Sequence, residues 1–171
     1  LYRYNIDLAL LPGQSEEGLT IKSYNGVKYR EVVVFNTVDD STADAQTPPA
    51  INGLQYVGYT YVNLATGNDD PILYENGVKV YSEAYDMFFY YARKPYELTF
   101  SNYDAGIEVK GHVFEEDISS YNTYIPQNPP SYPAGTYVFD GWYTSPEHQA
   151  EAKYTFDTMP ANDVILYAKW R

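Results

Sequence analysis

The sequence predicts a β-rich α+β protein built from two tandem copies of one small unit. Three observations lead to this fold class. The two halves of the chain share a series of residues in the same order, short segments alternate apolar with polar residues, and an acidic segment followed by prolines has the pattern of a short helix. With 171 residues, the chain is long enough for two small units.

The repeat is clearest where residues 46–57, QTPPAINGLQYV, are compared with residues 127–138, QNPPSYPAGTYV. Further along, the Tyr-Ala-Arg of residues 91–93 corresponds to the Tyr-Ala-Lys of residues 167–169. The offset between the copies shrinks on the way, which indicates a longer hairpin in the first copy. We therefore predict two domains, residues 1–94 and residues 95–171.

Strands are expected at both ends of the first copy. Residues 2–10 alternate, with Tyr, Ile and Leu on one side and Arg3, Asn5 and Asp7 on the other. The turn Pro12-Gly13 closes this strand, and a second strand follows around residues 19–24 or 27–35. The run from Tyr85 to Tyr91 is too apolar for simple alternation.

The second copy repeats this order. Tyr96, Leu98 and Phe100 alternate in its first strand, and Ile107, Val109 and Val113 belong to the next. Strands are then expected over residues 138–143, 153–156 and 164–170. Aromatic and aliphatic residues of these segments form the predicted core: Phe139, Trp142, Tyr154, Phe156, Ile165 and Tyr167.

One short helix per copy is expected after the first two strands and before the two or more strands that close the copy. In the second copy Glu115-Glu116-Asp117 precede an apolar face made by Ile118, Tyr121, Tyr124 and Ile125, and Pro126 ends the segment. In the first copy the corresponding segment is residues 39–46, before Pro48-Pro49. Each helix is expected to have about two turns.

Composition excludes several classes of protein. A net charge of -12 argues against binding to nucleic acid or anionic lipid, because both would be repelled. The absence of cysteine removes disulfides, thiol nucleophiles and Cys-ligated zinc. No apolar run approaches the length of a membrane-spanning helix, so no membrane insertion is expected. The chain begins at Leu1 without Met, and we interpret it as a piece of a longer protein.

The last third of the chain resembles a known family. FDGWYT at residues 139–144, YTFD at 154–157 and LYAKW at 166–170 are similar to the Listeria–Bacteroides repeat, the internalin B-repeat type. The resemblance covers nearly all of the second copy. The first copy has Tyr59-Thr-Tyr61 and residues 90–94 at the corresponding places but lacks the Trp and the Asp-Gly, so it would be a divergent copy.

This resemblance implies a fold and a setting. It implies a β-grasp-like, ubiquitin-like unit in each copy and a protein of the bacterial surface, usually Gram-positive: an adhesin or a large secreted protein attached to the cell wall. It carries no catalytic residues and no cofactor, so no enzyme is expected. The expected partners are neighbouring repeats and an unknown host or bacterial surface protein or glycan.

The motif residues have physical roles in this interpretation. Gly141 serves a bend or close approach of a strand, Asp140 hydrogen-bonds that bend, and Trp142 anchors the core. Trp170 is expected to cover the junction with a following module. The structural motif as a whole comprises Phe139, Asp140, Gly141, Trp142, Tyr167 and Trp170.

Other chemistry was weighed against these roles. Acidic clusters at residues 39–44 and 115–117 could supply paired carboxylates for hydrolysis, but they favour solvated segments. Calcium is the functional alternative at residues 39–44 or 68–70, although neither segment has the spacing of a known calcium loop. His112 and His148 alone do not make a zinc site. An intramolecular Lys–Asn crosslink, which some surface proteins contain, cannot be recognised from the sequence.

Exposed aromatic residues are the main candidates for binding. Tyr121, Tyr124 and Tyr132 cluster around prolines and could stack on sugars or anchor a protein interface, while ordinary packing is the alternative. The leading hypothesis is a non-catalytic spacer or stalk segment with a role in adhesion, because the short Arg93-Lys94-Pro95 connection restrains the two copies. The alternative is a carbohydrate- or protein-binding accessory module attached to an enzyme elsewhere in the parent chain.

Overall fold

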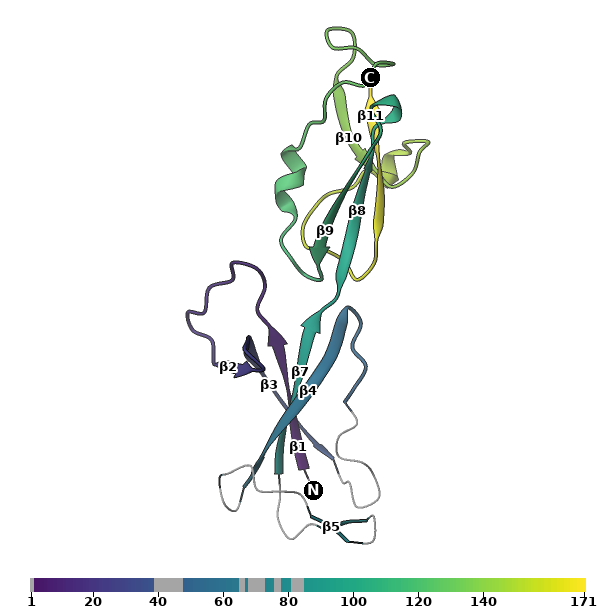
Figure 1. Cartoon of the computed structure of the whole chain (residues 1–171). Helices are drawn as coiled ribbons and strands as arrows, with labels where there is room; N and C mark the ends of the chain where they lie inside the picture. Colours follow the sequence, from purple (N-terminus) through teal and green to yellow (C-terminus); the bar gives the residue numbers. More distant parts are fainter. Residues whose placement is uncertain (1, 39–47, 65–66, 68–72, 76–77, 81–84) are drawn as a thin grey trace. The chain divides into compact units, whose positions relative to one another are not determined.

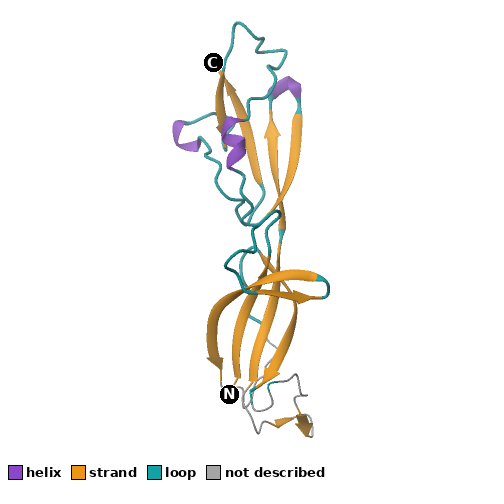
Figure 2. Cartoon of the chain, turned by 90° about the vertical axis from the view of Figure 1, so that its left-hand side faces the viewer, coloured by secondary structure: helices purple, strands orange, loops and turns teal. Residues whose placement is uncertain are grey.

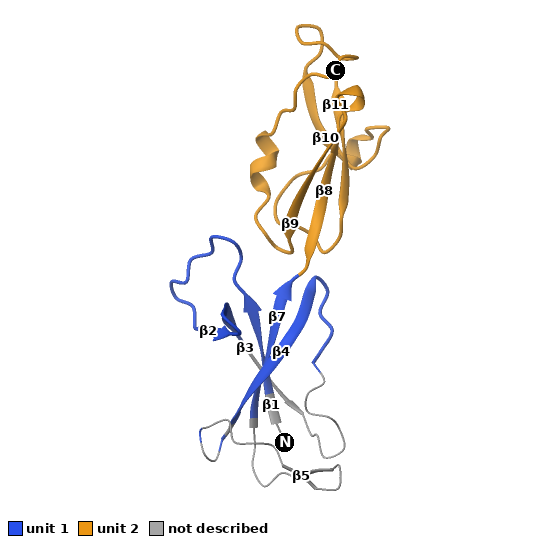
Figure 3. Cartoon of the chain, viewed as in Figure 1, with its two compact units in different colours: residues 1–93 blue, residues 94–171 orange. Residues whose placement is uncertain are grey.

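A computed structural model describes residues 2–38, 48–64, 67, 73–75, 78–80 and 85–171. The chain divides into two compact units, Leu1–Arg93 and Lys94–Arg171 (Figure 3). The division lies one residue before the boundary expected from the repeat. Both units are rich in strands, and the helices among the described residues are short 3₁₀ turns (Figure 2).

The first unit contains a five-stranded mixed sheet with the order β2-β3-β1-β7-β4 (Figure 1). The first strand, β1, pairs in parallel with the last, β7, while every other pair in this sheet is antiparallel. A separate two-stranded sheet pairs β5 with β6. The strands are β1 (Tyr2–Ala9), β2 (Ile21–Tyr24), β3 (Val27–Val38), β4 (Leu54–Asn63), β5 (Leu73–Glu75), β6 (Val78–Val80) and β7 (Tyr85–Arg93).

The central strands of this sheet are covered on both faces. Asn5 and Asp7 are both 0% exposed, although they alternate with the apolar Leu8 side, which is also buried. The polar side of β1 is therefore buried at these positions, whereas simple alternation predicts that it faces solvent. The same position explains the apolar run in β7, because Phe89 and Tyr90 are buried on opposite faces of a middle strand.

The sheet of the first unit is strongly curled. In a flat sheet β2 would lie about 14 Å from β7, three strand spacings away. Instead, the Tyr24 ring of β2 stacks on Tyr90 of β7 with 4.5 Å between centroids and 2° between planes. The register shift between Tyr56 and Gly58 contributes to this curvature, since bulges increase local twist. Tyr24 lies directly over Gly58, where a Cβ atom would come within 2.1 Å of the Tyr24 hydroxyl oxygen.

The second unit contains a four-stranded sheet with the order β10-β11-β8-β9. Again the first strand is parallel to the last, and the outer strands are antiparallel to them. Its strands are β8 (Pro95–Ser101), β9 (Ile107–Val113), β10 (Phe139–Tyr143) and β11 (Val164–Trp170). The 3₁₀ helices are η1 (Tyr103–Ala105), η2 (Ser119–Thr123) and η3 (Ala150–Ala152).

One face of this sheet carries the core. Phe100 packs edge-on against Trp142 with 4.8 Å between ring centroids, and Tyr124 stacks on the indole with 5.7 Å between centroids. The buried cluster comprises Leu98, Phe100, Ile118, Trp142, Phe156, Met159, Val164, Leu166, Ala168 and Trp170. Of the predicted core, Trp142 and Phe156 are buried, and Phe139 and Tyr154 pack against the cluster.

Two predicted core residues are wrong. Ile165 is 52% exposed, and Tyr167 is only partly buried on the same outer face of β11. The buried side of that strand is Val164, Leu166, Ala168 and Trp170. Both sides of β11 carry large apolar residues, so alternation alone does not say which side is inside.

The predicted α-helix of the second unit is a 3₁₀ turn instead. The amide N–H of Tyr121 donates to the Ile118 carbonyl, and that of Tyr124 donates to the Tyr121 carbonyl, which are i→i+3 bonds. The prolines that follow leave no room for a longer helix. The expected apolar face does form, because Ile118 is buried and Tyr121 and Tyr124 pack on the core. The predicted helix of the first copy lies outside the described residues.

The predicted strand at residues 153–156 is also absent from the second unit. Lys153 forms only an isolated bridge with Tyr143, and the next residues run as irregular chain. Asn122 holds this segment in place, since its side-chain amide donates to the Phe156 carbonyl at 2.7 Å and accepts from the Phe156 amide at 2.8 Å. Side-chain hydrogen bonds thus replace a strand ladder there.

Candidate interaction surface

The predicted ligand-facing tyrosines occupy two places in the second unit. Tyr121 and Tyr124 lie together beside η2, with 6.2 Å between ring centroids, whereas Tyr132 packs in a separate group with Tyr103 and Tyr137. All three predicted residues are partly buried. The Tyr121 hydroxyl is also hydrogen-bonded to His112 Nε2 at 2.7 Å. Packing within the unit therefore buries most of the surface of these three side chains.

A hollow with an aromatic wall lies next to Tyr124. Its volume is about 390 Å³, within the range of small-molecule sites. Phe100, Trp142 and Tyr124 supply its aromatic part. Its other lining residues come from the connection between β8 and β9, the start of β9 and the proline segment: Asn102, Ala105, Gly106, Ile107, Glu108, Pro126 and Gln127.

The polar side of this hollow is anionic. Glu108 accepts a hydrogen bond from the Tyr124 hydroxyl at 3.0 Å and pairs with Lys110 at 2.9 Å. The hydrogen bonds from Lys110 and Tyr124 lower the pKa of Glu108 below its usual value, so the carboxylate stays ionised. Burial raises the pKa of Tyr124, and the hydrogen bond to the negatively charged Glu108 raises it further. An aromatic wall beside fixed acceptors is an arrangement that can bind a hydroxyl-rich ligand.

The outer face of the sheet forms a second exposed surface. Ile165 of β11, Thr99 of β8 and Val109 of β9 lie side by side in register across three strands. Val109 is 52% exposed, and Ile107, one row further, is 68% exposed. Sequence analysis missed this surface because it assigned Ile165 to the core. The sequence does contain a signal for this surface. Ile107 and Val109 alternate with the charged residues 108 and 110, so the two apolar side chains share one face of the strand.

The motif residues hold the C-terminal strand in place. Gly141 has φ of +124° at the register shift between Phe139 and Gly141, a bulge geometry that favours glycine. The Trp170 indole N–H donates to the buried Asn102 Oδ1 at 2.8 Å. Trp170 is therefore part of the core of its own unit, and its expected role at a junction with a following module stays a prediction.

Asp140 forms ion pairs with two basic side chains, Lys169 and Arg171, rather than hydrogen bonds with the backbone of the bend. Its Oδ2 lies 3.4 Å from Lys169 Nζ and its Oδ1 lies 3.0 Å from Arg171 Nε. Partial burial would raise the pKa of Asp140, but the hydrogen bond from Lys169 and the neighbouring positive charges outweigh it and lower the pKa. Tyr167 lies on the same outer face, paired with Tyr143 across the strands.

The described residues contain no cluster of three or more His, Asp or Glu side chains able to hold a metal ion. His112 Nδ1 is bound by Glu116, and His148 packs its ring against Tyr143. The acidic residues 39–44 and 68–70 lie outside the described residues, so the calcium alternative there stays a hypothesis. The described helices include none long and apolar enough to cross a membrane.

Comparison with known proteins gives one family match. No curated protein matches the chain. Residues 96–169 match the family model of the Listeria-Bacteroides repeat domain, and this range spans nearly all of the second unit. The matched range begins in β8 and ends in β11, so it contains β9 and β10 entirely and all but one residue of each of the other two strands. The second unit is therefore similar over almost its whole length to the Listeria-Bacteroides repeat domain, a family typical of bacterial surface proteins.

Proposed function

We propose that this chain is a non-catalytic, tension-bearing spacer of a bacterial cell-surface or secreted protein. The family match of the second unit supports the surface setting. The single observation that supports the mechanical role is the same in both units. The first and the last strand of each unit are adjacent, central and parallel.

This strand arrangement determines how a pulling force acts. The chain enters the first unit at the start of β1 and leaves it at Arg93, the end of β7. Because β1 and β7 run in the same direction, tension slides them past each other along their length. Every hydrogen bond of the ladder then carries load at once, whereas peeling an antiparallel hairpin breaks its bonds one pair at a time. β8 and β11 have the same relation in the second unit.

Two further features support a tandem-repeat spacer. The order β4-β7-β1-β3 of the first unit is equivalent, in position and direction, to β10-β11-β8-β9 of the second. A central parallel pair flanked by antiparallel strands fits the expected β-grasp-like unit. Lys94 alone separates β7 from β8, and a one-residue connection next to Pro95 leaves less freedom than a glycine-rich linker.

Single-molecule force spectroscopy tests the mechanical role. The chain has no cysteine, so introduced cysteines give unique attachment points. We expect the second unit to resist a higher force when it is pulled from Lys94→Cys and Arg171→Cys than from Lys94→Cys and Phe114→Cys. The second pair pulls on the adjacent ends of β8 and β9 and peels them apart, since Pro95 pairs with Val113. Equal forces in the two geometries would contradict the proposal.

The hollow beside Tyr124 favours a second candidate function, binding of a glycan as an accessory or adhesive module. Its aromatic wall and the ionised Glu108 suit stacking on a sugar ring and accepting bonds from its hydroxyls. A glycan array with the intact chain tests this function. We expect a retained glycan to be lost on Glu108→Gln, whereas Glu147→Gln, an exposed change outside the hollow, should have no effect.

A further inference from the structure

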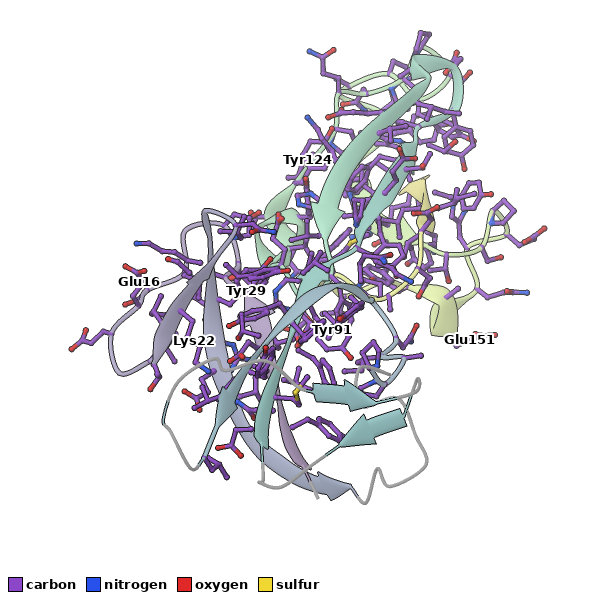
Figure 4. All side chains as sticks on the ribbon, turned by 60° about the horizontal axis from the view of Figure 1, so that its bottom comes forward. Glu16, Lys22, Tyr29, Tyr91, Tyr124 and Glu151 are labelled. Carbon is purple, nitrogen blue, oxygen red and sulfur yellow. The ribbon has the colours of Figure 1, made fainter. Side chains whose placement is uncertain are left out.

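A lysine and two acidic residues meet on one face of the first unit. Asp7 of β1 lies directly opposite Glu31 in the β1–β3 ladder, so their side chains share a face of the sheet. Lys22 of β2, labelled in Figure 4, reaches over β3 toward them. Its Nζ lies 3.6 Å from Asp7 Oδ2 and 3.9 Å from Glu31 Oε2. The curl of the sheet described above brings these three strands into this arrangement.

The contact between Lys22 and Asp7 is buried and poorly compensated. Asp7 is 0% exposed, and the Lys22 amino nitrogen is covered although its stem is partly exposed. Neither oxygen of Asp7 nor this nitrogen has a hydrogen-bond partner among the described residues. The nitrogen instead lies 3.3 Å from the centroid of the Phe88 ring. Ion pairs removed from water are costly without such hydrogen bonds, so neutralising both groups would relieve the fold of this cost.

We propose that Lys22 Nζ and Asp7 Cγ condense into an intramolecular isopeptide bond, with Glu31 as the proton carrier. The site is autocatalytic, and its chemical product is an amide that ties β2 to β1 across β3. This inference rests on the local geometry alone and does not depend on the proposed spacer function.

The step balances without any co-reactant. The neutral amine of Lys22 attacks the carbonyl carbon of the protonated Asp7 carboxyl group, which forms the C–N bond. The Glu31 carboxylate accepts a proton from the attacking nitrogen and passes it to the departing hydroxyl group. The C–O bond then breaks and one water leaves, so Glu31 ends as it began. Proton transfer within the initial ion pair supplies the two neutral reactants.

The surroundings favour the protonated form of Asp7. Burial raises the pKa of Asp7 to about 6, and the repulsion from Glu31 adds to this effect while the charge of Lys22 opposes it. About a tenth of Asp7 is therefore protonated at pH 7, in the form that can lose its hydroxyl as water. The Phe88 ring beside the nitrogen keeps bulk water away from the reacting groups.

The intact mass of the purified 171-residue chain, measured after denaturation, tests the proposal. We expect the folded wild-type chain to weigh one water less than its sequence mass of 19.5 kDa. Trypsin should fail to cleave after Lys22, and fragmentation should find Lys22 and Asp7 in one branched peptide. A wild-type chain at full sequence mass, even after long incubation in the folded state, would overturn the proposal and leave a simple buried ion pair.

Variants separate this bond from other losses of water. Lys22→Arg keeps the charge but removes the nucleophile, so this variant should have the full mass. A water deficit that persists in Lys22→Arg indicates a succinimide at an aspartate and contradicts the proposal. Glu31→Gln keeps the shape of the side chain and should slow bond formation at least tenfold. Unchanged kinetics in Glu31→Gln would refute its role as proton carrier. Circular dichroism verifies the folding of each variant.

Discussion

Adjacent positions in β11 provide the sharpest test of the core of the second unit. Leu166 is 0% exposed, and it lies between the neighbouring strands β8 and β10, paired with Phe100 of β8. Truncating a fully buried leucine to alanine costs about 2–5 kcal/mol, and a site between paired strands can collapse little, so we expect about 3 kcal/mol or more for Leu166→Ala. Ile165 is 52% exposed, and Ile165→Ala should cost about 1 kcal/mol or less.

The chain supplies its own reporter for this comparison. Both tryptophans, Trp142 and Trp170, belong to the second unit, so tryptophan fluorescence follows the unfolding of that unit within the intact chain. Urea titrations of the two variants should show a loss of unfolding free energy at least threefold larger for Leu166→Ala. Should Leu166→Ala be unfolded without urea, Leu166→Val gives a smaller loss that can be measured. An Ile165→Ala cost equal to that of the leucine variant would refute the assigned face of β11.

Three further predictions concern single side chains. Gly141→Ala should destabilise the second unit by about 1 kcal/mol or more, because residue 141 has a positive φ that residues with a Cβ rarely adopt; fluorescence-monitored urea unfolding measures this loss. Asn122→Ala should cost about 1–3 kcal/mol by removing both bonds to the Phe156 backbone, whereas the exposed Asn162→Ala should be nearly neutral in the same titration. Where the Asp7 carboxyl is free, its ¹³C resonance should titrate with a midpoint of about 6 rather than 3.8. Because the folded state then binds this proton more tightly than the unfolded state, the stabilisation is full below pH 3.8 and is lost as the pH rises through about 6; a midpoint near 3.8 would contradict the burial argument.

The extent of strand structure could be predicted from the sequence because alternation is a local signal. Val164–Trp170 is one strand with the bounds that were expected, and both alternatives for the second strand of the first copy are strands, β2 and β3. The prediction fails where the outcome depends on what covers a strand. Asn5 and Asp7 have the pattern of a solvent face, yet neighbouring elements cover them, and nothing in the local sequence reports that cover.

The candidate sites show the same limit more strongly. Tyr121 and Tyr124 are recognisable as an aromatic face from their spacing, but only the fold shows that Tyr124 stacks on Trp142 beside a hollow. The contact between Asp7 and Lys22 joins residues of different strands through the curl of the sheet. No spacing rule relates these residues, because the curvature that brings them together depends on bulges and packing rather than on periodicity.

The two units solve the problem of buried polar groups in different ways, and this difference bears on the crosslink. In the second unit the buried Asn102 is satisfied, since its amide donates to the Gln127 carbonyl and its oxygen accepts from the Trp170 indole. The first unit has no tryptophan and places an ionisable pair, Asp7 and Lys22, in its covered sheet face. A noncovalent pair of this kind destabilises a small sheet, whereas an amide removes both charges and closes a loop between residues 7 and 22. A closed loop of about 15 residues stabilises by about 3 kcal/mol in the chain-entropy model. A covalent tie at that place would thus offset the absence of a tryptophan from the first unit.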